Sequence, residues 1–105
     1  NYLNCSGNKL TALNLKGLAK LQNIHCSFNQ LTTLDARDSP VVAYLDCYSN
    51  KLKSLVVRST DPYVRYTLNL NPDLSSICCS VAEVSKIQNE INTLGYNSTI
   101  TTNCF

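Results

Sequence analysis

The feature that most constrains this chain is a spacing of 21 residues that recurs through most of its 105 residues. Six positions keep the spacing through four successive units, apart from one extra residue after the last asparagine. These positions hold Leu3, Ile24, Leu45 and Tyr66; Cys5, Cys26, Cys47 and Leu68; Asn8, Asn29, Asn50 and Asn71; Leu10, Leu31, Leu52 and Leu74; Leu13, Leu34, Leu55 and Ile77; Leu15, Ala36, Val57 and Cys79. Such a period predicts stacked repeats, each of which buries its apolar side against its neighbours.

Each unit reads L-x-x-L-x-C-x-x-N-x-L-x-x-L-x-φ, where φ is an apolar residue. The L-x-C part alternates with period two and predicts a short strand whose leucine and cysteine point inward. The L-x-x-L-x-φ part is expected to return along the opposite wall and close the interior. The pattern therefore predicts an α/β solenoid, a right-handed coil of about four 21-residue repeats with short parallel strands on its concave face.

Two of the columns form ladders of one residue type. An asparagine amide at the end of each strand can bond the backbone of its own unit and of the neighbouring unit. Cysteines on adjacent strands run parallel, which suits buried free thiols better than disulfides. The predicted ladders are Asn8, Asn29, Asn50 and Asn71, and Cys5, Cys26 and Cys47.

After the fourth unit the period stops and a cap is expected. Ser80 and Glu83 have the spacing of a capping box, and the apolar residues that follow recur at helical spacing as far as Leu94. Gly95 is suited to end a helix over 81–94. Residues 98–102 are rich in β-formers, and we expect a strand there beside the strand of the fourth unit, reached by a right-handed crossover. The chain is thus one domain, 1–105, with repeats at about 1–20, 21–41, 42–62 and 63–80 and a C-terminal cap at 81–105.

The last cysteine, Cys104, lies within reach of the adjacent pair Cys78 and Cys79. By its column Cys79 points inward, which favours a disulfide between Cys78 and Cys104 that locks the cap, with Cys79 as the rival partner. The opposite end of the array has no such cap. Further repeats before Asn1 would cover it, and self-association through this end is the alternative.

Composition excludes several classes of function. The 9 basic and 7 acidic residues are scattered singly, so neither a nucleic-acid-binding stripe nor a polybasic membrane anchor is expected. No apolar segment approaches the roughly 20 residues that a membrane-spanning helix needs, so no membrane insertion is predicted. The chain has no methionine, which suggests a processed protein or a piece of a longer one.

With these columns established, the chain resembles the cysteine-ladder leucine-rich repeats of bacteria, which have a 21-residue period and include internalin-type surface proteins. It is most similar to secreted or cell-surface repeat proteins of Bacteroidetes, through the stretches Leu3–Leu13 and Ile24–Leu34. Asn71-Pro-Asp-Leu-Ser-Ser-Ile-Cys78 and the terminal Cys104 are similar to the start and end of the cap in those proteins. The resemblance covers essentially the whole chain and implies an extracellular bacterial binding or adhesion module.

The outward positions of the predicted strands carry several aromatic and charged residues that would share one face. Aromatic rings among polar side chains are typical of a surface that recognises a protein or a glycan. The candidate contact residues are Tyr2, His25, Phe28, Tyr44, Asp46, Tyr48 and Arg65.

No catalytic site is predicted. His25 and Asp46 would be neighbours, but no nucleophile or enclosed pocket accompanies them, so they are interpreted as a surface pair. No cofactor is expected: the ladder thiols lack the paired spacing of a zinc site, and calcium at Asp35, Asp38, Asp61 or Asp73 stays an alternative. The first hypothesis is therefore a non-enzymatic, secreted or cell-surface module that binds a protein or carbohydrate. The second is a structural C-terminal cap and spacer of a longer array.

Overall fold

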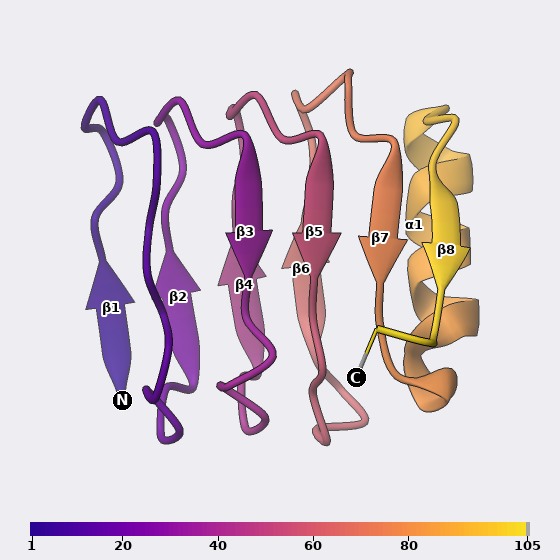
Figure 1. Ribbon diagram of the computed structural model, residues 1–105, viewed down its shortest axis with the longest axis horizontal. Coiled ribbons are helices and arrows are strands. Elements are labelled where there is room, and N and C mark those ends of the chain that lie inside the picture. Colours follow the sequence, from indigo (N-terminus) through magenta and orange to yellow (C-terminus); the bar gives the residue numbers. More distant parts are fainter. Residues whose placement is uncertain (105) are drawn as a thin grey trace.

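The computed structural model describes residues 1–104 and contains two parallel four-stranded sheets with one α-helix at the C-terminal end (Figure 1). We call them sheet A and sheet B. Sheet A has the order β1 (Tyr2–Asn4), β2 (Asn23–His25), β4 (Tyr44–Asp46) and β6 (Arg65–Thr67). Sheet B has the order β3 (Thr33–Asp35), β5 (Ser54–Val56), β7 (Ser76–Cys78) and β8 (Thr99–Thr101). From β2 to β7 the chain visits the two sheets alternately, which fits a repeat-type α/β fold.

The 21-residue spacing sets the register of sheet A. Leu3 pairs with Ile24, Ile24 with Leu45, and Leu45 with Tyr66. The strands predicted from the L-x-C segments therefore form where they were expected. They are parallel because each begins at the same point of successive units.

Sheet B adds to the expectation, because the return segments were predicted to form the opposite wall and strands were predicted only on the concave face. Leu34 and Ala36 are buried on either side of exposed Asp35, so this segment alternates with period two like the first one. Leu55 pairs with Leu34 at the usual spacing, and with Ile77 at one residue more. The extra residue after Asn71 is thus accommodated in the turn between β6 and β7.

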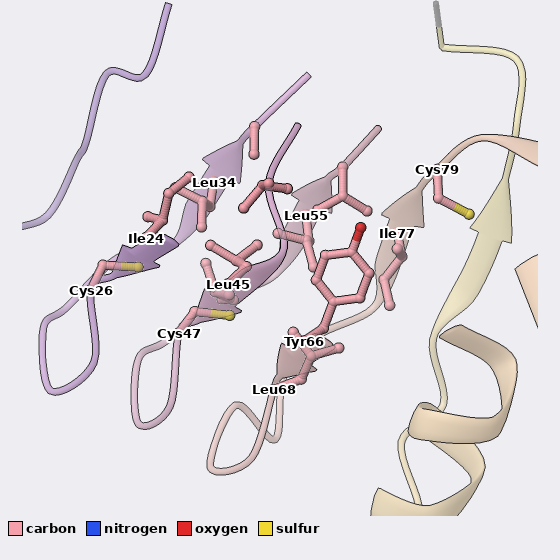
Figure 2. Close-up of a cluster of buried hydrophobic side chains, with 14 of the residues drawn as sticks. Ile24, Cys26, Leu34, Leu45, Cys47, Leu55, Tyr66, Leu68, Ile77 and Cys79 are labelled. Carbon is pink, nitrogen blue, oxygen red and sulfur yellow. The ribbon is translucent and has the colours of Figure 1, made fainter. Parts of the chain in front are cut away.

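The core lies between the sheets, and Figure 2 shows side chains from both pointing toward one another. Ile24, Cys26, Leu45 and Cys47 have no exposed surface. The cysteines of the ladder are free thiols, as predicted. Each thiol lies against the strand of the next unit, where its sulfur donates to a backbone carbonyl: Cys5 to His25 at 3.7 Å, Cys26 to Asp46 at 3.4 Å and Cys47 to Thr67 at 3.3 Å.

The asparagine ladder bonds the backbone of successive units as expected. The Asn50 amide nitrogen donates to the carbonyls of Cys47 in its own unit and Cys26 in the preceding one, and its oxygen accepts from the Leu31 N–H at 3.0 Å. Asn29 and Asn71 repeat this arrangement. These amides satisfy backbone groups that would otherwise be buried without partners.

The cap consists of a 3₁₀ turn (Val81–Glu83), helix α1 (Val84–Leu94) and β8. The predicted helix over 81–94 is therefore found, and Gly95 ends it with φ 73°. The prediction for the last strand was wrong: β8 pairs with β7 in sheet B and does not lie beside β6. The return segment of the fourth unit is itself a strand, β7. The chain therefore leaves β7, passes through α1 and returns as β8 beside that same strand.

Glu83 joins the cap to the last two units. Its buried carboxylate accepts from the Ser80 hydroxyl at 2.7 Å and from the Ser59 N–H at 3.1 Å. The Tyr66 hydroxyl donates to its other oxygen. Burial, together with this bond, raises the pKa of the Tyr66 hydroxyl above its usual range, so the tyrosine stays neutral.

A disulfide joins Cys78 to Cys104, and buried Cys79 is the thiol left free, as the column argument favoured. After β8 the chain turns back past the end of β7, as Figure 1 shows. Arg37, which follows β3, donates from Nη1 to the Cys104 carbonyl at 3.0 Å. The C-terminal segment is thus fastened to β7 by the disulfide and to the residues after β3 by the Arg37 hydrogen bond.

Candidate binding surface

The outer face of sheet A carries a row of rings, one from each of three neighbouring strands. The centroids of Tyr2 and His25 are 5.1 Å apart, and those of His25 and Tyr44 are 5.2 Å apart. The Arg65 guanidinium lies 5.7 Å from the centroid of Tyr44. We call these four residues the aromatic row. The ring contacts run diagonally across the strands: Tyr44 is level with Arg65 in the register, whereas His25 is level with Asn4 and Asp46, two positions further along.

Neighbouring rings of the row are inclined to one another rather than stacked in parallel. Tyr2 is tilted by 36° to His25, and Tyr44 meets His25 edge to face at 70°. The Tyr44 hydroxyl is fixed by a hydrogen bond of 3.0 Å with Thr67 Oγ1. Because the Tyr44 ring is held by this bond and by its contact with His25, Tyr44 has little side-chain freedom left to lose on binding.

A second aromatic pair lies just beyond the carboxyl ends of the strands. Phe28 and Tyr48 have centroids 5.5 Å apart. Asp46 connects this pair to the row, since Oδ1 accepts from the Tyr48 N–H at 3.0 Å while Oδ2 lies 3.7 Å from His25 Nδ1. All seven residues predicted from the strand register therefore lie on one face of the structure.

Phe28 is held in an unusual backbone conformation. Its φ is 54°, and the equivalent positions Gly7, Ser49 and Leu70 have φ values of 73°, 57° and 58°. Left-handed backbone is costly for residues other than glycine, more so for a bulky side chain. Phe28 and Leu70 nevertheless occupy this position and are 59% and 56% exposed. The sequence argument missed this feature, although Gly7 in the same column was a signal for it.

A polar recess of about 380 Å³ adjoins the aromatic row between β6 and α1. Its lining residues are Val64, Arg65, Tyr66, Thr67, Asn69, Lys86 and Glu90. The helical residues Lys86 and Glu90 were not among the predicted contacts, because those came from strand positions alone and the sequence does not show which face of α1 lies toward β6.

The buried thiols are unsuited to nucleophilic chemistry. Burial raises the pKa of Cys26 to about 12 and that of Cys47 well above its usual value. A thiol that stays protonated and covered is a poor nucleophile and a poor metal ligand. Within residues 1–104, no group of three or more histidine, cysteine or acidic side chains could hold a metal ion.

Three of the four acidic residues considered for calcium have partners within the described structure. Asp35 pairs with Arg37 Nε at 3.0 Å, and Asp38 accepts from the Gly17 N–H at 3.2 Å. Both line a hollow of about 420 Å³ on the side of sheet B, away from the aromatic row. Asp61 accepts from the Tyr63 N–H at 2.8 Å.

Comparison of the chain with protein-family models, with curated proteins and with solved structures finds no match. The part of the chain that the structure describes has no helix long and apolar enough to cross a membrane.

Proposed function

We propose that this chain is a leucine-rich-repeat solenoid and acts as a non-enzymatic binding module of an extracellular or cell-surface protein. The outer face of sheet A, with the aromatic row and the Phe28–Tyr48 pair, is its recognition surface. The fold part of the proposal rests on the 21-residue register that sheet A keeps from β1 to β6. The disulfide between Cys78 and Cys104 is in keeping with an oxidising, extracellular setting.

The observation that carries the proposal is the ordering of Tyr2, His25, Tyr44 and Arg65 into one contiguous row. Tyrosine and arginine are enriched among residues that dominate binding energy at protein interfaces. Tyr2 is 62% exposed, so most of its side chain is available to a ligand.

Between a protein and a carbohydrate ligand, the arrangement of the rings favours a protein. A sugar that stacks on an aromatic ring needs a free ring face, and the His25 side chain, whose ring contacts both Tyr2 and Tyr44, is only 23% exposed. The row instead offers ring edges, hydroxyls and a guanidinium, which suit the mixed contacts of a protein surface.

The test is binding of the chain to protein and glycan arrays, with the Tyr44→Ala/Tyr48→Ala double variant beside the wild type. The double variant should lose binding by about tenfold or more while its thermal unfolding stays cooperative. The control is Tyr63→Ala, which removes a tyrosine that is 83% exposed but lies in the turn before β6. Equal binding by all three proteins would place the site elsewhere.

The second candidate is a structural cap and spacer. The Glu83 contacts and the disulfide support it, since both fasten the last unit to α1 and β8. This candidate predicts that the chain binds nothing on either array, whereas a longer piece of its parent protein does.

A further inference from the structure

The recess between β6 and α1 extends the aromatic row, because Arg65 belongs to both. Its guanidinium lies over the Tyr44 ring, and Arg65 is also one of the residues that line the recess. A ligand that lies along the row from Tyr2 therefore reaches this recess at its end.

The Arg65 guanidinium is positioned to bind a carboxylate. In residues 1–104 the ion pairs join His25 to Asp46 and Arg37 to Asp35, and neither involves Arg65. A guanidinium that lies over a ring keeps the N–H groups along its edge free for a second partner. Those groups form a planar fork that matches the two oxygens of a carboxylate.

Lys86 supplies a second fixed positive charge. Its Nζ donates to the Val64 carbonyl at 2.8 Å and to the Pro62 carbonyl at 3.3 Å, which holds the ammonium beside the start of β6. The one carboxylate in the lining is that of Glu90. Two cations against one anion leave the recess with a net positive charge, which favours an anionic group.

We propose that this recess binds a carboxylate side chain from an acidic segment of the protein partner. Arg65 forms the paired hydrogen bonds, and Lys86 adds attraction. The neighbouring side chains of the segment contact Tyr44 and His25. This inference rests on the proposed function, and it specifies the chemistry of the partner where it meets the cap.

The experiment is selection of a random displayed peptide library against the wild type, Arg65→Gln, Arg65→Lys and the control Lys53→Gln. Lys53 is an exposed lysine directly before β5, on the side of sheet B. Wild type and Lys53→Gln should enrich peptides that contain Asp or Glu, whereas Arg65→Gln should show no acidic preference. Replacing the carboxylate of a selected peptide by its carboxamide should weaken binding to the wild type about tenfold and leave binding to Arg65→Gln unchanged. Arg65→Lys keeps the charge without the fork and should restore only part of the affinity.

Three results would overturn the inference. One is equal acidic enrichment by the wild type and Arg65→Gln, and another is absence of acidic enrichment by the wild type. The third is Arg65-dependent binding of oligogalacturonate with no such binding of acidic peptides, which would make the partner a glycan.

The Tyr44→Ala/Tyr48→Ala variant separates the two proposals. If it loses peptides that Arg65→Gln retains, the sheet binds protein but the recess is not a carboxylate site.

Discussion

At the scale of single residues, each column of the repeat performs one physical task, and its substitution has a cost that can be estimated. The Asn50 side chain is the sole partner among the described contacts of the Leu31 N–H. The two carbonyls to which Asn50 donates each have a second donor. The Cys26 carbonyl also accepts from Asn29, and the Cys47 carbonyl also accepts from Asn71. The main loss on truncation is therefore one buried, unpaired donor.

Asn50→Ala should lower the free energy of unfolding by about 2 kcal/mol, because an orphaned buried N–H costs about 1–3 kcal/mol. Urea denaturation followed by circular dichroism would measure it. Asn8→Ala is the matched control, since Asn8 is exposed and bonds only carbonyls of its own unit. Equal losses in the two variants would contradict the role given to the ladder.

The left-handed position of the repeat gives a prediction of the opposite sign. Ser49 has a φ of 57°, a conformation that costs a non-glycine residue about 1 kcal/mol or more. Ser49→Gly should therefore raise the stability by about 0.5 kcal/mol after the added chain entropy of unfolded glycine is subtracted. Ser54→Gly, in strand β5, should lower it instead. A fall in the denaturation midpoint of Ser49→Gly would show that the conformation carries no strain.

At the scale of elements, the sequence predicted sheet A well because L-x-C alternation and the period specify both strand and register. Sheet B was missed although Leu34 and Ala36 alternate in the same way. The L-x-x-L spacing before them hid the signal, because it is not a strand period. Because β7 was not predicted to be a strand, it could not be predicted as the partner of β8.

The cap shows which structural features could be predicted from the sequence and which could not. Ser80, Glu83 and Gly95 predicted the helix from local chemistry alone. The bond from Tyr66 to Glu83 depends on where the helix docks, which no local pattern encodes. The same reason explains why Lys86 and Glu90 were absent from the predicted surface.

The disulfide should contribute roughly 3 kcal/mol, because it closes a loop with a sequence separation of 26 residues. The Cys78→Ala/Cys104→Ala variant should lose about that much in urea denaturation. Hydrogen exchange should rise in β8 before it rises in β4. The control Cys79→Ala removes a buried thiol without opening a crosslink, and should leave the exchange of β8 little changed. Unaltered β8 exchange in the disulfide variant would mean that strand pairing alone holds the cap.

At the scale of the whole molecule, the two ends differ. The cap covers the last unit, while β1 lies at the edge of sheet A and leaves Leu3 and Cys5 only half-buried. Their equivalents Ile24 and Cys26 are fully covered by units on both sides. This contrast is the physical basis for the two expectations stated for this end, further repeats before Asn1 and, as the alternative, self-association through the first unit.

Self-association through this end should respond to salt in a definite direction. Residues 1–34 contain three lysines and no acidic residue, so two such ends repel each other. Salt screens that repulsion and should strengthen a dimer. Sedimentation equilibrium at low and high salt would show it. A monomer under both conditions, or a dimer that salt dissociates, would contradict pairing of these ends.

The central claim is that the ordered rings on sheet A form the recognition surface. The most direct test is the dissociation constant of one captured protein partner for Tyr44→Ala and for Tyr63→Ala, each compared with the wild type. The account predicts a constant at least about tenfold larger for Tyr44→Ala and an unchanged one for Tyr63→Ala. Equal constants for Tyr44→Ala and the wild type, with the variant still folded, would contradict it.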